Sequence, residues 1–95
     1  MMKTIPVTAI VPTANRATVL LQTLSSIAAQ NCQPEVIVII DASDNNETEI
    51  ICKQNIQGLL SKIDYQRAIV KGAASQRNQG IKNITNPVVF FFDDD

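Results

Sequence analysis

The chain has 95 residues, of which 45% are hydrophobic and 18% charged, and this predicts one small globular domain over residues 1–95 rather than a disordered chain. Its net charge of −1 lacks the basic excess that is typical of nucleic-acid binding. With no His and only two Cys, the chain offers neither a zinc-binding pattern nor a disulfide framework, and free thiols indicate the reducing conditions of the cytoplasm.

The first half of the chain predicts two strands and two helices. The short β-branched runs Val7–Val11 and Val36–Ile40 are typical of strands that are covered on both faces, as in a parallel sheet. Between them, Ala17–Gln30 carries apolar residues at 20, 24, 27 and 28, which share one face of a helix. A second helix is expected over residues 46–60, with Asn46 as its N-terminal cap.

The second half of the chain continues the same alternation. Asp64–Val70 predicts an edge strand, Ala73–Ile84 a helix, and Val88–Phe92 a buried strand. Four strands that alternate with three helices predict an α/β fold, a Rossmann-like parallel sheet with helices on both faces in three layers. With the strand order 3-2-1-4, the first and fourth strands would be neighbours.

Polar residues follow each predicted strand. Parallel strands end at the same edge of the sheet, so the segments that follow them in the sequence should lie close together there. Ligands bind at this edge in open α/β folds. These segments are Pro12–Arg16, Asp41–Asp44, Lys71–Gly72 and Asp93–Asp95. The first and last are expected to face each other across a cleft, with Asp41 close by.

The three terminal acids predict a metal site. Asp93–Asp95 are three of the nine acids, so the residues before them carry a net charge of +2. Adjacent carboxylates repel one another unless a cation lies between them, and oxygen ligands suit Mg²⁺ or Mn²⁺. In a continued strand, Asp93 and Asp95 point to one side as metal ligands, which leaves Asp94 to accept a hydrogen bond from a sugar hydroxyl. Arg77 could neutralise a phosphate.

Each of these residues also has a purely structural interpretation. The acids could be a solvated chain end, and Asp41 could be a turn former. Arg77 could be a surface charge, and Asn15 could cap the first predicted helix. The shared sheet edge, rather than any single residue, favours a functional interpretation.

Four segments, PTANR, DAS, ASQRNQGI and DDD, occur in this order, and they resemble the N-terminal, nucleotide-sugar-binding half of family 2 glycosyltransferases of the GT-A fold. The resemblance covers essentially the whole chain. The dinucleotide fingerprint G-x-G-x-x-G, the phosphate-binding P-loop and the G-x-S-x-G elbow are all absent.

The resemblance implies roles for individual residues. Pro12 and Thr13 would contact the nucleotide base through backbone groups, and Asp41 would accept a hydrogen bond from it. Arg77 would lie near the nucleotide, and Asn15 belongs to the same nucleotide-sugar-binding set. The terminal acids would form the D-x-D motif, with Asp95 as the main metal ligand, Asp93 beside it and Asp94 near the ribose.

Three departures from the family pattern bear on the choice of base. Ala14 replaces the usual aromatic residue, Ile40 stands where the first of two acids is common, and Ala42 replaces glycine.

The resemblance further implies an inverting transfer of a sugar from a nucleoside-diphosphate sugar, with a UDP-sugar as first choice, to an acceptor hydroxyl. Mn²⁺ or Mg²⁺ would act on the leaving diphosphate, and the acceptor would be a glycan or a lipid-linked molecule. The catalytic base and the acceptor site are expected downstream, as is any contact with the cytoplasmic face of a membrane, so the fragment alone is predicted to be inactive. Exposed Phe90–Phe92 predict self-association. The alternative is a non-catalytic nucleotide- or partner-binding module with a solvated acidic end.

Overall fold

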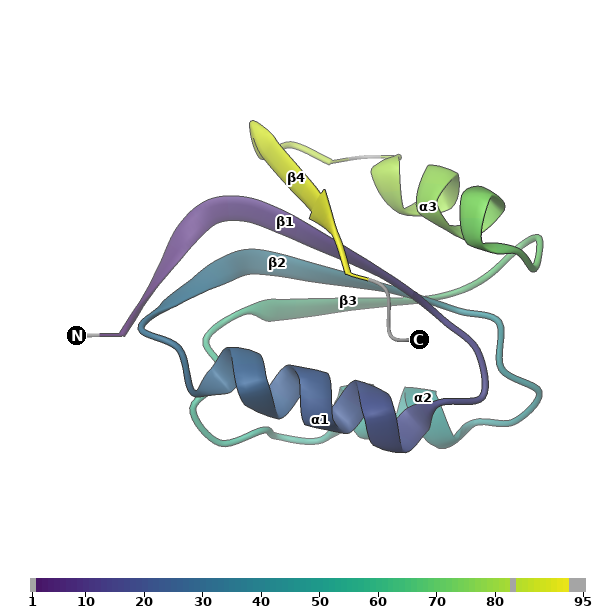
Figure 1. Cartoon of the computed structure of the whole chain (residues 1–95), viewed down its shortest axis with the longest axis horizontal. Coiled ribbons are helices and arrows are strands. Elements are labelled where there is room, and N and C mark those ends of the chain that lie inside the picture. The colour runs from purple at the N-terminus through teal and green to yellow at the C-terminus, as the bar shows by residue number, and fades with distance from the viewer. Residues whose placement is uncertain (1, 83, 93–95) are drawn as a thin grey trace.

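A computed structural model describes residues 2–82 and 84–92. The seven predicted elements are all present and alternate along the chain (Figure 1). They are β1 (Lys3–Thr13), α1 (Ala17–Ala28), β2 (Cys32–Asp41), α2 (Glu47–Lys53), β3 (Lys62–Arg67), α3 (Ala73–Ile81) and β4 (Val88–Phe91). Within the described part, no helix is long and apolar enough to cross a bilayer.

The strands form one parallel sheet in the order β3-β2-β1-β4. This is the predicted order, and it places the last strand of the chain beside the first. The register aligns Thr13 with Asp41 and Asp41 with Arg67, so that the final residues of β1, β2 and β3 stand side by side. We call these three residues the edge row.

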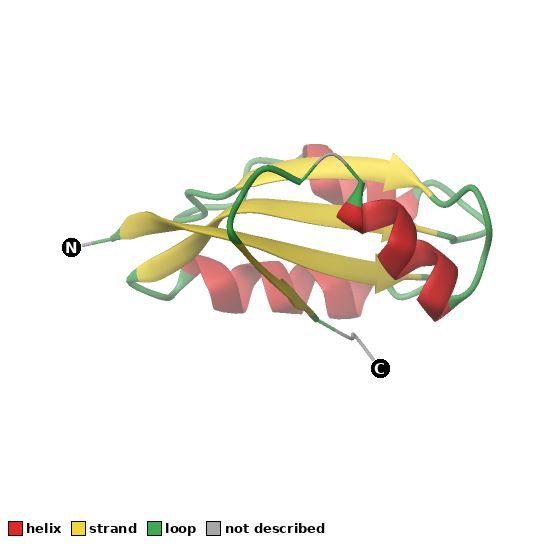
Figure 2. Ribbon diagram, turned by 90° about the horizontal axis from the view of Figure 1, so that it is seen from above, coloured by secondary structure: helices red, strands yellow, loops and turns green. Residues whose placement is uncertain are grey.

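Helices cover both faces of the sheet, as predicted. In Figure 1, α1 and α2 lie below the sheet and α3 lies above it. Figure 2 is viewed from above, so α3 lies in front of the strands and α1 behind them. The larger core cluster lies on the α1 and α2 side, where Leu20, Leu24 and Ile27 of α1 meet alternate residues of β1 and β2. The smaller cluster, Ile10, Val38 and Ile40, lies under α3.

Several predicted element boundaries were wrong. The strands β1 and β2 each begin four residues before the predicted Val7 and Val36, and α3 ends at Ile81 rather than Ile84. The helix expected over residues 46–60 ends at Lys53, because Gln54 adopts an extended backbone and Gly58 takes a positive φ of 85°. Asn46 occupies the N-cap position but makes no capping hydrogen bond through its side chain. The side chain of Asn45 instead accepts a hydrogen bond from the Glu47 N–H at 3.1 Å.

The third strand also begins and ends two to three residues early relative to the predicted Asp64–Val70. The Ala68 N–H still pairs with the Asp41 carbonyl of β2, but the Ile69 N–H and the Arg67 carbonyl bind α3, so the strand ends at Arg67. The Ile69 N–H donates to the Gln79 side chain at 2.8 Å, and the Gln79 amide donates to the Arg67 carbonyl at 2.9 Å.

A buried glutamine ties the opposite, amino end of the sheet together. Gln33 is completely buried, and its amide donates to the carbonyls of Ala28, Gln30 and Gly58 at 2.9–3.3 Å. Its carbonyl oxygen accepts from the Leu60 N–H at 2.8 Å. One side chain therefore holds the turn after α1 against the segment between α2 and β3.

Candidate functional site

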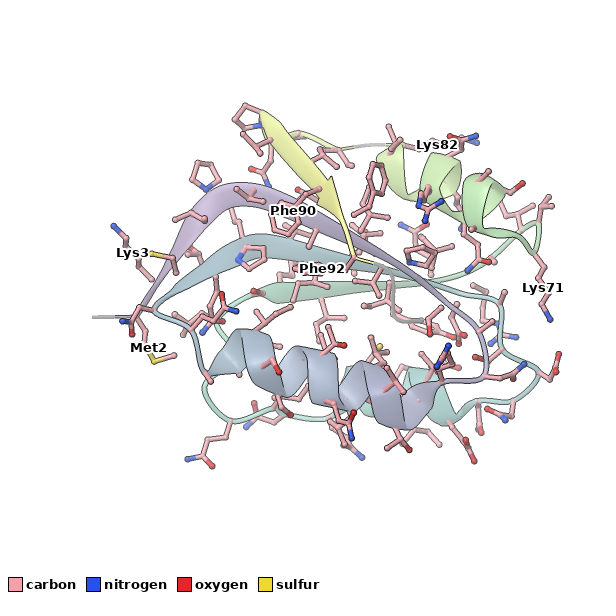
Figure 3. The ribbon with its side chains drawn as sticks, in the orientation of Figure 1. Met2, Lys3, Lys71, Lys82, Phe90 and Phe92 are labelled. Atoms are coloured by element: carbon pink, nitrogen blue, oxygen red, sulfur yellow. The ribbon has the colours of Figure 1, made fainter. Side chains whose placement is uncertain are left out.

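The edge row lies at the carboxyl end of the sheet, where the sequence predicts the site. Figure 3 labels Lys3 at one end of the molecule and Lys71 at the other, beyond the ends of the strands. The Thr13 carbonyl accepts from the Ala42 N–H at 2.9 Å, and the Asp41 carbonyl accepts from the Ala68 N–H at 2.8 Å. Backbone hydrogen bonds thus continue past the strands and hold the following loops side by side.

Asp41 is the buried centre of this edge. It has no exposed surface, and both of its carboxylate oxygens accept hydrogen bonds. The Ser43 N–H donates to Oδ1 at 2.9 Å, while the Tyr65 hydroxyl at 2.6 Å and Arg67 Nη1 at 3.0 Å donate to Oδ2. A buried carboxylate is costly unless it is paired and hydrogen-bonded, and these three donors meet that requirement.

Arg67 joins β3 to the loop that follows β2. Besides Asp41, its guanidinium donates to the Ser43 carbonyl at 2.7 Å and to the Asn45 carbonyl at 3.3 Å. Its hydrogen bond with the Tyr65 hydroxyl raises the pKa of Arg67, so the guanidinium stays charged. Burial, and then the hydrogen bond to Asp41, raises the pKa of Tyr65, so its hydroxyl remains a donor at neutral pH.

Asn15 connects the loop after β1 to the loop after β2. Its side chain accepts from the Asp44 N–H at 2.9 Å and donates to Asp44 Oδ2 at 3.2 Å. Its own N–H donates to Ser43 Oγ at 2.7 Å, and its backbone has a positive φ of 57°. The interpretation of Asn15 as a helix cap is wrong, because Arg16 holds the N-cap position of α1.

The polar side chains of α3 fasten this helix to the strand ends. The amide of Gln76, which is buried, donates to the Thr13 carbonyl at 3.1 Å and to the Ile40 carbonyl at 2.8 Å. Its oxygen accepts from the Gly72 N–H at 3.1 Å. These contacts explain part of the ASQRNQGI segment as structural, and they fix the start of α3 beside β1 and β2.

Arg77 lies on the α3 side of the sheet, next to the last strand. Its guanidinium carbon is 6.0 Å from the centre of the Phe91 ring, within the range of a cation–π contact. The next aromatic residue, Phe92, still runs along β1, because its N–H donates to the Ile10 carbonyl at 2.9 Å. Arg77 is therefore near the end of β4.

Of the predicted site residues, Thr13, Asn15 and Asp41 lie together at the carboxyl edge of the sheet, linked through Ser43 and the strand register. Pro12 and Thr13 are buried, and the Thr13 carbonyl already accepts hydrogen bonds from the Ala42 N–H and the Gln76 amide, so the contact of these two residues with the base stays a prediction. Asp93, Asp94 and Asp95 lie outside the described residues, and their predicted roles stay predictions. Among residues 2–82 and 84–92, there is no group of three or more His, Cys, Asp or Glu that could hold a metal ion.

Sequence reasoning missed Tyr65, Arg67 and Gln76. The alternation in the third strand gave a signal for the first two, because Tyr65 and Arg67 share a face of β3 with Ile63. Their contact with Asp41 depends on the register between β2 and β3, which no local pattern specifies.

Two comparisons with known proteins bear on the chain. The model of the family described as "Glycosyl transferase family 2" matches residues 8–95. A curated protein of Rickettsia bellii (strain RML369-C), named "Uncharacterized glycosyltransferase", is 35% identical over 92 residues. That alignment covers 94% of this chain but 13% of the relative, so the chain spans about one eighth of the relative's length.

Proposed function

Because the chain belongs to glycosyl transferase family 2, we propose that it is the donor-binding part of an inverting, metal-dependent glycosyltransferase. The family implies a nucleotide-sugar donor and an acceptor in general. The observation that carries the proposal is the arrangement at the carboxyl edge. There the edge row of Thr13, Asp41 and Arg67 spans three strands. The fourth strand, β4, pairs with β1 and precedes Asp93–Asp95 in the sequence.

The proposed metal ligands are Asp93 and Asp95, with Mn²⁺ or Mg²⁺ as the ion. Carboxylate oxygens fit a hard divalent cation, and these acids directly follow Phe92, which is hydrogen-bonded to Ile10 near the carboxyl end of β1. When bound, such an ion stabilises the negative charge of the leaving diphosphate as a Lewis acid. Asp94 would accept a hydrogen bond from the ribose.

The remaining residues would hold the rest of the donor. Arg77 lies beside β4 on α3, and its guanidinium suits a diphosphate as a multidentate donor. Pro12 and Thr13 would contact the base through backbone groups at the end of β1. Asn15 would keep the loops after β1 and β2 together through its contacts with Ser43 and Asp44.

The finer features of the reaction belong to the same proposal. We favour a UDP-sugar carrying a hexose as donor and a glycan or lipid-linked hydroxyl as acceptor. A cytoplasmic location would agree with two cysteines that form no disulfide with each other.

Calorimetry tests the proposal directly. The 95-residue chain is titrated with UDP, GDP and dTDP, each with and without Mn²⁺. We expect UDP to bind, and to bind more weakly when Mn²⁺ is omitted. Failure of all three nucleotides to bind in the presence of Mn²⁺ would contradict the proposed function.

The Asp95→Ala variant tests the metal ligand. We expect it to lose the effect of Mn²⁺ on nucleotide binding while its circular dichroism spectrum stays unchanged. Asp64→Ala is the matched control, because Asp64 is an exposed carboxylate near the amino end of β3. If Asp95→Ala keeps the full Mn²⁺ dependence, the assignment of this ligand is wrong.

A further inference from the structure

Arg67, rather than Asp41, forms the accessible surface at the end of the edge row. The side chain of Asp41 is 0% exposed, whereas that of Arg67 is 52% exposed. A ligand that approaches this edge therefore meets a guanidinium with the carboxylate behind it. The chemistry that it meets is that of N–H donors, because a guanidinium has no acceptor.

Part of the donor capacity of Arg67 remains available. A guanidinium has five N–H donors, and the contacts recorded within the described residues use Nη1 and one hydrogen of Nη2. The Nε–H and the second Nη2–H have no recorded partner there. The Ser43 and Asn45 carbonyls, together with Asp41, hold the guanidinium in one orientation.

The strand order indicates which part of a donor would reach Arg67. In the proposed function the metal and diphosphate would bind after β4, and β3 is three strand positions away in the order β3-β2-β1-β4. Adjacent strands are about 4.8 Å apart, so the separation is about 14 Å. With its diphosphate at β4, a nucleoside diphosphate would lie across the strand ends, and its base would reach the end of the sheet where Arg67 stands.

We propose that Arg67 is the residue that determines base specificity, by donating a hydrogen bond to an exocyclic carbonyl oxygen of the base. Asp41 acts as a positioning residue, which orients the guanidinium together with Tyr65. This inference rests on the proposed function. It predicts a preference for bases with an oxo group, such as uracil, over bases with an amino group at the same position, such as cytosine.

Comparison of UDP with CDP gives the sharpest test, because uracil has a 4-oxo group where cytosine has a 4-amino group. In calorimetry with Mn²⁺, we expect the native chain to prefer UDP by about ten- to a hundredfold, the usual effect of a hydrogen bond to a charged group. Arg67→Gln should weaken UDP binding and bring the ratio of the two affinities close to one. Asp41→Asn should keep most of the preference, since the guanidinium remains.

The opposite pattern would overturn the inference. If the carboxylate of Asp41 itself contacted the base, Arg67→Gln would uncover it, and UDP binding would stay the same or improve, while Asp41→Asn would lose the preference. Equal affinities of the native chain for UDP and CDP would also overturn the inference, but would leave the proposed function intact. Absence of binding to any nucleotide would contradict the proposed function itself, and the inference with it.

Two further variants guard against an effect on folding. The double variant Asp41→Asn with Arg67→Gln removes both charges, so that no buried charge is left unpaired, and it should still lose the preference. Lys53→Gln removes the same charge from an exposed ion pair with Glu49 on α2, and it should keep native UDP and CDP affinities. Thermal unfolding of each variant verifies that it is folded.

Discussion

At the scale of single residues, both burial in the core and the charge of Asp41 in the edge row change the pKa of the Cys52 thiol. Burial first, and then the negative charges of Asp41 and Glu49, together raise the pKa of this thiol from 9.0 to about 12. The thiol therefore stays protonated and neutral at physiological pH. Thiolate is the reactive form of cysteine, so Cys52 is a packing residue at neutral pH rather than a nucleophile.

The raised pKa of Cys52 has a definite effect on stability. The folded state holds the proton more tightly than the unfolded state, so this contribution to stability is fully present below pH 9.0 and is lost as the pH rises toward 12. We expect the urea midpoint of the native chain to fall over this range, and that of Cys52→Ala to fall less steeply. The raised pKa of Tyr65 lowers the stability of the native chain and of the variant alike at high pH. Only the difference between their two curves therefore measures the contribution of Cys52. Parallel curves would show that Cys52 contributes nothing.

At the scale of elements, α3 approaches the sheet closely at Gly80. A Cβ atom at this position would lie 2.6 Å from Ile10 Cγ2 and 3.4 Å from Ile40 Cγ1, and the first distance is too short for two carbon atoms. Glycine is required here by space and not by backbone conformation. The helix can thus lie low enough for Gln76 and Gln79 to reach the ends of β1, β2 and β3.

Gly80→Ala should therefore destabilise the fold, although alanine favours helices. We expect a net loss of about 1–3 kcal/mol in the free energy of unfolding, the usual cost of overpacking a core, measured by urea denaturation. Ser75→Ala, at an exposed position of the same helix, is the control and should be neutral or slightly stabilising. A Gly80→Ala variant as stable as native would mean that α3 can shift outward without cost.

The elements also show how far sequence reasoning reaches. Buried strands were predictable, because the apolar runs around Ile10 and Ile39 admit no other placement in an alternating α/β chain. The position of Asp41 at the carboxyl edge followed from the same pattern. Its pairing with Arg67 did not, because it needs the register of two strands that are separated by a helix. The early end of α2 was also hidden, since the bonds that replace it come from Gln33, far along the chain.

At the scale of the whole molecule, the edge strand β4 exposes three large apolar side chains. Val88, Phe90 and Phe91 of β4 are 51%, 36% and 43% exposed. The prediction of a buried strand over Val88–Phe92 was therefore wrong, because β4 is an edge strand, whereas the predicted apolar surface at this end is present. Phe90 and Phe92 contact each other edge to face, with ring centres 5.1 Å apart (Figure 3). Within the described residues, β4 pairs with β1 alone, so its outer backbone groups face away from the sheet.

Such an edge is expected to associate with a second copy of the chain. Light scattering of the 95-residue chain should show an average mass that increases with concentration, and Phe90→Lys should reduce this increase. Leu60→Lys, which changes an exposed apolar residue outside β4, is the matched control and should behave as the native chain does. A constant monomeric mass at high concentration would exclude self-association.

The pairing of β4 with β1 also links ligand binding to the last step of folding. The four residue pairs between this short strand and β1 join residues 81 positions apart in the sequence, so β4 can pair only after synthesis has passed Phe91. The acids proposed to hold the metal come directly after it. A donor bound at these acids would favour the state in which β4 is paired with β1. The substrate would thus stabilise the strand that precedes the residues proposed to bind it.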